Sequence, residues 1–297
     1  GAARGVGRSG RRAHRPSVML ACRPMLTLPL ASTISPLQAA VLGAVQGLTE
    51  LLPVSSSAHL YLVPTLLGWK YEGLAFDVAL HAGTLVALVI AFWNDWWTLL
   101  TDLFAKDAAK AREARTLWLL LIVATIPAAI VGKLLDDIAE QQLRSLLLQA
   151  GTLTVFGALL WLADRTPAKG ADERSPGWFT GIAMGLAQCL ALVPGVSRSG
   201  ITMTAGRFLG LSRPAAARFS FLLATPITFG AIVLKLKDVP HDVPPATLAI
   251  GVVSAAVFGT LAIKLLLGMV RRTGFGVFFA YRAVLSLGIV AFWWTHR

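Results

Sequence analysis

Apolar residues run along this chain in six long stretches, near residues 76–93, 117–134, 146–163, 216–234, 246–269 and 275–295. A helix needs about 20 mostly apolar residues to cross the hydrocarbon core of a bilayer. A transmembrane β-strand needs only about 10, so these lengths favour helices over barrel strands. The pattern predicts an all-α integral membrane protein with about six transmembrane helices.

Two further apolar runs are interrupted by polar residues and proline. Residues 34–52 precede Pro53 and a short run at 60–67, and residues 178–193 precede Pro194-Gly195 and a short run that ends at 209. The short run at 60–67 is less than half of the roughly 20 residues that a crossing needs, so each pair indicates a re-entrant helical hairpin. Irregular backbone at membrane depth is tolerated where it lines a cavity. Three predicted spans separate the hairpins, which therefore enter from opposite faces as an inverted-topology repeat.

Composition supports this class: 56% of the residues are hydrophobic and 14% are charged, which excludes an ordinary soluble domain. We expect a basic, disordered extension at residues 1–30, with Met25 left open as the natural start. One membrane domain should follow at 31–297, with repeat one at about 31–165 and repeat two at about 175–297. The six arginines at 1–24 account for half of the net charge of +12, and no basic stripe is interleaved with aromatic residues, so we expect no nucleic-acid partner. The Lys/Arg excess per loop is too small to orient the chain.

Each interrupted run holds a similar polar island. The first reads QGLTELLPVSSS over residues 46–57 and the second reads QCLALVPGVSRS over residues 188–199, and the two align without a gap. The copies differ where Glu50 aligns with Leu192 and where Ser56 aligns with Arg198. One copy offers a carboxylate and the other a guanidinium, so we expect the two halves to build one asymmetric site.

The first island holds an acid, an amide and three hydroxyls. Gln46 and Glu50 are four residues apart and share one face of a helix. A carboxylate within an apolar run is costly to bury and is a functional-site hypothesis by default; a structural hydrogen bond to a facing helix is the alternative. The serines at 55–57 can cap the helix after Pro53, and the N-terminus of a helix binds anions.

A histidine and an arginine complete the two islands. His59 would lie one turn beyond the serines, where it could act as a general base, as a nucleophile or as a hydrogen-bond donor to phosphate. A satisfied interior histidine is the alternative. Arg198 starts a predicted helix, where the dipole repels a cation unless an anion shares the site, and its planar fork suits phosphate oxygens. A snorkelling side chain and a salt bridge to Glu50 are the alternatives for this arginine.

Four weaker candidates lie outside the islands. Asp77 and His81 are one helical turn apart near the start of a predicted span, where an interfacial position explains them about as well as a cavity-facing one. Arg213 and Arg218 flank the start of a later span, and we expect them to be interfacial cations.

The segments QGLTELLPVSSSAHL and PGVSRSG resemble the two signature motifs of the undecaprenyl-diphosphate phosphatase family, the bacitracin-resistance type. The resemblance covers about residues 30–295, including FDVALHAGTL and SRPAAARFSFLLATP. It implies a membrane enzyme that hydrolyses undecaprenyl diphosphate to undecaprenyl phosphate and inorganic phosphate. That reaction would recycle the carrier lipid for peptidoglycan synthesis and confer bacitracin resistance.

The motifs and the resemblance together define the candidate site residues. The catalytic candidates are Glu50, Ser56, His59 and Arg198. The substrate-binding candidates are Gln46, Ser55, Ser57, Ser197, Ser199 and Gly200. The resemblance also implies a divalent cation, Mg²⁺ or Ca²⁺, with Glu50 as its ligand, although the neutral Gln46 puts a clamp of two carboxylates in doubt.

The resemblance implies a place in the bacterial cytoplasmic (inner) membrane, with several passes and a site open towards the periplasm or cell exterior. The partners would be the polyprenyl diphosphate and membrane lipid, and a homodimer is left open. Ser56 could attack or align a water, with His59 or Glu50 as proton acceptor, and His59 as direct nucleophile is the rival. An anion or lipid-phosphate transporter is the alternative function, because inverted repeats with broken helices are a transporter plan.

Overall fold

The computed structural model describes residues 1, 34–70, 72–135, 145–169, 176–238 and 243–296. These residues form helices and turns without a strand, which confirms the all-α class. The extension expected at residues 1–30 lies outside the described residues apart from Gly1. In chain order the helices are α1 (Pro36–Leu51), α2 (Ser56–Leu67), α3 (Leu74–Ala91), α4 (Trp93–Asp102), α5 (Ala108–Leu134), α7 (Leu146–Asp164), α8 (Trp178–Gln188), η1 (Cys189–Leu192), α9 (Arg198–Phe208), α10 (Arg213–Lys235), η2 (Leu236–Asp238), α11 (Pro245–Val270) and α12 (Gly276–Thr295).

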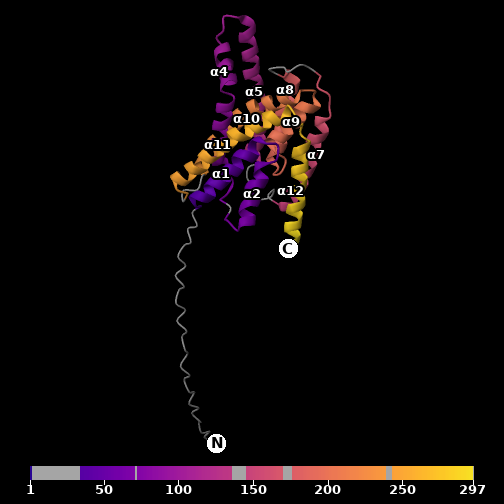
Figure 1. Cartoon of the computed structure of the whole chain (residues 1–297). Helices are drawn as coiled ribbons and strands as arrows, with labels where there is room; N and C mark the ends of the chain where they lie inside the picture. Colours follow the sequence, from indigo (N-terminus) through magenta and orange to yellow (C-terminus); the bar gives the residue numbers. More distant parts are fainter. Residues whose placement is uncertain (2–33, 71, 136–144, 170–175, 239–242, 297) are drawn as a thin grey trace. The chain divides into compact units, whose positions relative to one another are not determined.

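Six of the described helices are long and apolar enough to cross a membrane, which confirms the predicted spans: α3, α5, α7, α10, α11 and α12. The largest boundary difference is in α5, which begins at Ala108, well before the apolar stretch at 117–134. Its first turn is capped by Asp107, whose carboxylate accepts a hydrogen bond from the Ala109 N–H at 2.9 Å. The helix therefore extends beyond its apolar part, and α4 lies beside this end of it (Figure 1).

Two short helix pairs stand where the interrupted runs predict re-entrant hairpins. We call α1 with α2 the first hairpin, and α8 with η1 and α9 the second hairpin. In α1, Ser35 and Gln38 form a reciprocal capping box at its start. The helix ends at Leu51 because Pro53 forces the preceding Leu52 into extended backbone, with φ −75° and ψ 146°.

Close helix contacts show that the two halves repeat one arrangement. α1 packs against α11, and α8 packs in the same way against α5. The aligned residues Gly43 and Gly185 lie at these contacts: a Cβ on Gly43 would be 2.1 Å from the carbonyl oxygen of Gly251, and one on Gly185 would be 2.2 Å from that of Ala124. Small residues let membrane helices approach this closely. Three of the six candidate spans separate the hairpins, which is the number that the predicted inverted-topology repeat requires.

Candidate active site between two helical hairpins

The turns of the two hairpins share one unusual backbone conformation. The aligned residues Ser55 and Ser197 both have φ 75°, and they are the non-glycine residues with positive φ among the described residues. Such a conformation costs about 1–3 kcal/mol and persists only where the surroundings enforce it. Each serine hydroxyl also lies close to the second serine along, Ser57 at 3.1 Å and Ser199 at 3.2 Å. The strained turns therefore mark the aligned islands as a functional region.

An ion pair joins the hairpins at this point. Nη2 of Arg198 lies 2.8 Å from Oε1 of Glu50, and the Ser56 hydroxyl donates to Oε2 of the same carboxylate at 2.5 Å. Glu50 is 9% exposed and Arg198 is 12% exposed. The sequence left phosphate binding and a salt bridge to Glu50 as alternatives for Arg198, and the structure has the salt bridge. Nη1 of Arg198 is also buried, and no described residue accepts its hydrogen bond.

His81 is the third neighbour of the carboxylate. Its Nε2 lies 3.4 Å from Oε2 of Glu50, and its Nδ1–H donates to the backbone carbonyl of Asp77 at 2.8 Å. His81, Arg198 and the Ser56 hydroxyl all lie against the carboxylate of Glu50 and stabilise its charged form. Glu50 is therefore ionised and can accept a proton only in concert with a change in these partners.

His59 is turned towards a different helix. Its Nδ1–H donates to the backbone carbonyl of Ser55 at 2.7 Å, and its Nε2 lies 2.7 Å from the hydroxyl of Tyr281 in α12. His59 is buried, which favours the neutral ring. Because the carbonyl can only accept, the proton is on Nδ1, and the Tyr281 O–H donates to Nε2. The structure thus brings together Glu50, Ser56, Arg198 and His81, with both nitrogens of His59 engaged elsewhere.

The remaining candidates line the two turns. Ser199 donates to the backbone carbonyls of Glu50 and Leu52, at 3.2 and 3.1 Å, and so ties α9 to the end of α1. Ser197 caps α9 by accepting from the Gly200 N–H at 3.2 Å. Ser57 is exposed, and its hydroxyl accepts a hydrogen bond from the Gly195 N–H of the second turn at 3.5 Å.

Gln46 is buried without a described partner. It is 0% exposed, and neither its amide oxygen nor its amide nitrogen has a hydrogen-bond partner among the described residues. Its aligned counterpart Gln188 is 2% exposed and equally without one. A buried amide that lacks a partner costs roughly 1–3 kcal/mol. Gln46 lies one turn before Glu50, on the same face of α1.

Arg282 in α12 is a site residue that the sequence analysis missed. It is fully buried, and it donates to the carbonyl of Pro53 in the first turn and to those of Gly195 and Val196 in the second. An arginine within the last apolar stretch is a signal for function that the sequence does contain. The bond pattern shows its structural effect, which is to hold the two turns against each other.

The two other arginine candidates have carboxylate partners. Arg213 forms a two-bond ion pair with Asp164 at 2.5 and 2.9 Å, and Arg218 pairs with Asp95. Arg213 thereby ties the start of α10 to the end of α7, and Arg218 ties α10 to α4. Neither contacts the carboxylate of the site.

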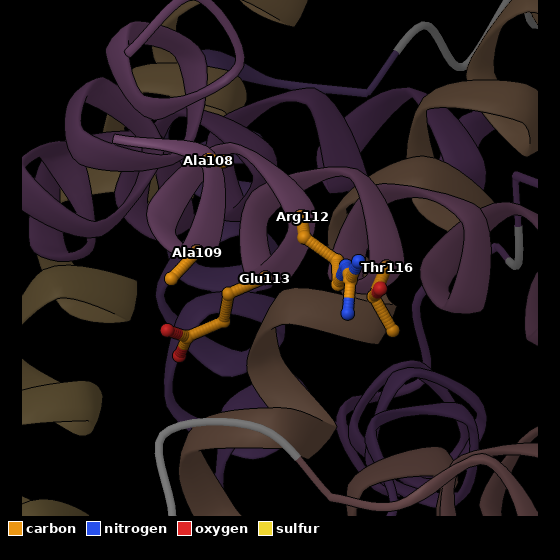
Figure 2. Close-up of a pocket in the computed structure, with 5 residues that line it drawn as sticks. All are labelled: Ala108, Ala109, Arg112, Glu113 and Thr116. Atoms are coloured by element: carbon orange, nitrogen blue, oxygen red, sulfur yellow. The ribbon is translucent and has the colours of Figure 1, made fainter. Parts of the chain in front are cut away.

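A surface hollow at the start of α5 lies apart from these residues. Figure 2 shows the side chains that line it: Ala108, Ala109, Arg112, Glu113 and Thr116. None of them belongs to either hairpin. The hollow therefore adds no residue to the candidate site.

Comparisons with known proteins show the family of this chain. Residues 39–289 match the model of the family described as bacitracin resistance protein BacA. An undecaprenyl-diphosphatase of Moorella thermoacetica is 51% identical over 262 residues, covering 88% of this chain and 99% of that protein. Undecaprenyl-diphosphatases of Pelotomaculum thermopropionicum and Gemmatimonas aurantiaca are 49% and 51% identical, covering 85% and 86% of this chain and 95% and 96% of theirs. The chain belongs to the bacitracin resistance protein BacA family.

Proposed function

We propose that this protein is an undecaprenyl-diphosphate phosphatase, which releases inorganic phosphate from the lipid diphosphate and returns undecaprenyl phosphate to cell-wall synthesis. The observation that best supports this function is the buried contact of Glu50 with Arg198 and Ser56, the first residues of α9 and α2. A site for the terminal phosphate needs donors, and Arg198 Nη1 and the first N–H groups of α2 and α9 supply them. The names of the relatives support the same substrate.

Phosphoryl transfer depends chiefly on positioning and on neutralising the charge of the transferring group. In the proposed reaction the Ser56 oxygen attacks the terminal phosphorus while its proton passes to Glu50, and the bond to the lipid-phosphate oxygen breaks. Water then hydrolyses the phosphoserine and restores the hydroxyl. Water attack aligned by Ser56 is the second route, and it uses the same carboxylate as proton acceptor. Both routes follow from the 2.5 Å contact between Ser56 and Glu50.

The residues present fit a divalent cation that arrives with the diphosphate. No described group of three or more His, Cys, Asp or Glu side chains could hold a metal ion alone. Mg²⁺ is commonly bound by one or two carboxylates together with substrate phosphates. The unpartnered Gln46 amide oxygen and the Glu50 carboxylate are the oxygen ligands that α1 offers. A bound cation would supply charge neutralisation at the diphosphate.

No single loop carries enough Lys and Arg to orient the chain, but the Lys and Arg residues summed over one face support an orientation in the inner membrane. Successive spans reverse direction, so the α4–α5 turn, the end of α7 and the α11–α12 turn share one face. Most of the described Lys and Arg residues lie there: Lys106, Lys110, Arg112, Arg115, Arg165, Lys169, Arg207, Arg213, Arg271 and Arg272. Loops rich in Lys and Arg stay in the cytoplasm. The first hairpin enters from the opposite face, which we assign to the periplasm or cell exterior.

Phosphate release from undecaprenyl diphosphate by the purified protein in detergent tests this function. We expect release by the wild type, and its loss in Glu50→Ala and in Arg198→Ala. Arg165→Ala is a matched control, because Arg165 follows the end of α7 and stacks on Trp161, not on a residue of either polar island. Absence of release from folded wild-type protein, with or without Mg²⁺ or Ca²⁺, would favour a transporter of lipid phosphate.

A further inference from the structure

We propose that His59 is a positioning residue, clamped between the Ser55 carbonyl and the Tyr281 hydroxyl, which holds the strained first turn so that Ser56 faces Glu50. The inference rests on the proposed function and adds two residue roles to it. It makes Tyr281 part of the site's support. It also removes His59 from the candidates for nucleophile and proton acceptor.

Both ring nitrogens of His59 already have hydrogen-bond partners. A nucleophile or general base needs a free nitrogen lone pair within reach of the reacting atoms. Nδ1 of His59 carries the proton that is donated to Ser55, and the lone pair of Nε2 accepts from Tyr281, with both contacts at 2.7 Å. The ring is 7% exposed, and its plane lies within 8° of the tyrosine ring. Neither nitrogen is directed at Ser56 or at Glu50 by a hydrogen bond.

The first turn lacks a side-chain cap at the start of its helix α2. Ser197 satisfies its helix start by accepting from Gly200, whereas the Ser55 side chain makes no capping bond to α2. The backbone N–H of His59 reaches the Ser55 carbonyl only at 3.4 Å. The imidazole supplies the short bond to that carbonyl instead. At the aligned position the second hairpin has Ile201, which cannot form such a bond.

Tyr281, which bonds His59, lies on the span that also bonds the backbone of both turns. Tyr281 and Arg282 are neighbours on α12, and Arg282 donates to the Pro53 carbonyl at 3.3 Å and to the Gly195 carbonyl at 2.7 Å. Two adjacent residues of one span therefore reach both turns. Tyr281 acts on the first turn through His59, while Arg282 bonds the backbone of both.

Substitutions at position 59 separate positioning from chemistry. In His59→Asn the amide nitrogen takes the place of Nδ1 and can still donate to Ser55, but it has no basic lone pair. We expect this variant to keep kcat within about tenfold of the wild type, and His59→Ala to fall about a hundredfold, with KM changed less than kcat in both. We expect no phosphohistidine after rapid quenching. Equal loss of all activity in the Asn and Ala variants, or full activity in the Ala variant, would overturn the proposal.

Removing the anchor tests the same clamp from the other side. Tyr281→Phe deletes one hydroxyl and should lower kcat about fivefold, and in His59→Ala it should have no further effect, because the two groups act in series. Tyr61→Phe, on the same helix as His59, is the matched control and should leave kcat unchanged. A double-mutant cycle on the thermal unfolding of the full-length protein in detergent gives a readout that needs no turnover. If the two substitutions are coupled in unfolding but the wild type releases no phosphate, the proposed function is wrong and the clamp stands. If their effects on unfolding are additive, the clamp is wrong.

Discussion

The two hairpins have one backbone plan and opposite chemical roles. In each hairpin the second helix begins after a serine at φ 75°. The hydroxyl of that serine is hydrogen-bonded to the hydroxyl of a second serine, which lies two positions further along the chain. The first hairpin holds the carboxylate of Glu50, where the second has Leu192. The second holds the guanidinium of Arg198, where the first has Ser56. The duplicated scaffold brings two strained turns together, and divergence of two positions makes their meeting point a polarised site.

The supports of the turns differ as well. The second turn is held by its own Ser197 cap and by Thr152 of α7, whose hydroxyl donates to the Pro194 carbonyl at 2.7 Å. The first turn depends on His59 and on Tyr281 from α12. Arg282 of α12 bonds both turns, so the difference is that the second turn has a side-chain cap of its own, whereas the first relies on the imidazole of His59. Substitutions can therefore test the two turns separately.

The largest effect should come from the residues at which the hairpins differ. Glu50→Gln keeps the shape of the side chain but removes its charge and basicity, and we expect kcat to fall about a thousandfold. Arg198→Lys keeps the charge but loses the planar fork, and we expect a fall of about a hundredfold. Steady-state phosphate release measures both. Near-wild-type turnover in Glu50→Gln would show that the carboxylate does not accept the proton.

The next largest effect concerns the residue that joins the two turns. Arg282→Met removes bonds to several buried carbonyls and should lower the free energy of unfolding by about 3 kcal/mol. The exposed Arg272→Met is the matched control and should change it by less than about 0.5 kcal/mol. Thermal unfolding in detergent compares the two. Equal stability of both variants would contradict a structural link between the turns.

Hydropathy was sufficient to predict the spans, and Pro53 and Pro194 were sufficient to predict the breaks, because both depend on local sequence. The aligned islands also predicted that a carboxylate and a guanidinium would share one site. The neighbours of that site could not be predicted, since they depend on how each helix is rotated. His81 faces Glu50 and His59 faces Tyr281, although the sequence places His59 nearer the motif. Arg282 stands out in the sequence as a charge within an apolar stretch. The two turns that it bonds could not be predicted, because they lie far from it along the chain.

A smaller effect tests whether the hairpins pack equivalently. Gly43→Ala and Gly185→Ala each place a methyl group about as close to a facing carbonyl oxygen, at 2.1 and 2.2 Å. Overpacking of this kind costs about 1–3 kcal/mol, so we expect both variants to lose a similar amount of stability. Gly151→Ala, with open space around its Cβ, should lose none. A loss confined to one of the two aligned glycines would show that the repeat is equivalent in sequence but unequal in packing.

The smallest effect should come from the strained serines themselves. Glycine at φ 75° relieves a steric cost of about 1 kcal/mol, but it also increases the entropy of the unfolded chain by a comparable amount. Ser197→Gly additionally loses the cap on Gly200, which costs a few tenths of a kcal/mol, roughly the usual value for a cap replaced by glycine. Ser55→Gly loses no cap, and it keeps the backbone carbonyl to which the imidazole of His59 donates. We therefore expect Ser55→Gly to be the more stable of the two variants by about 0.5 kcal/mol in thermal unfolding. The reverse order would mean that the Ser55 hydroxyl, and not the imidazole of His59, supports the first turn.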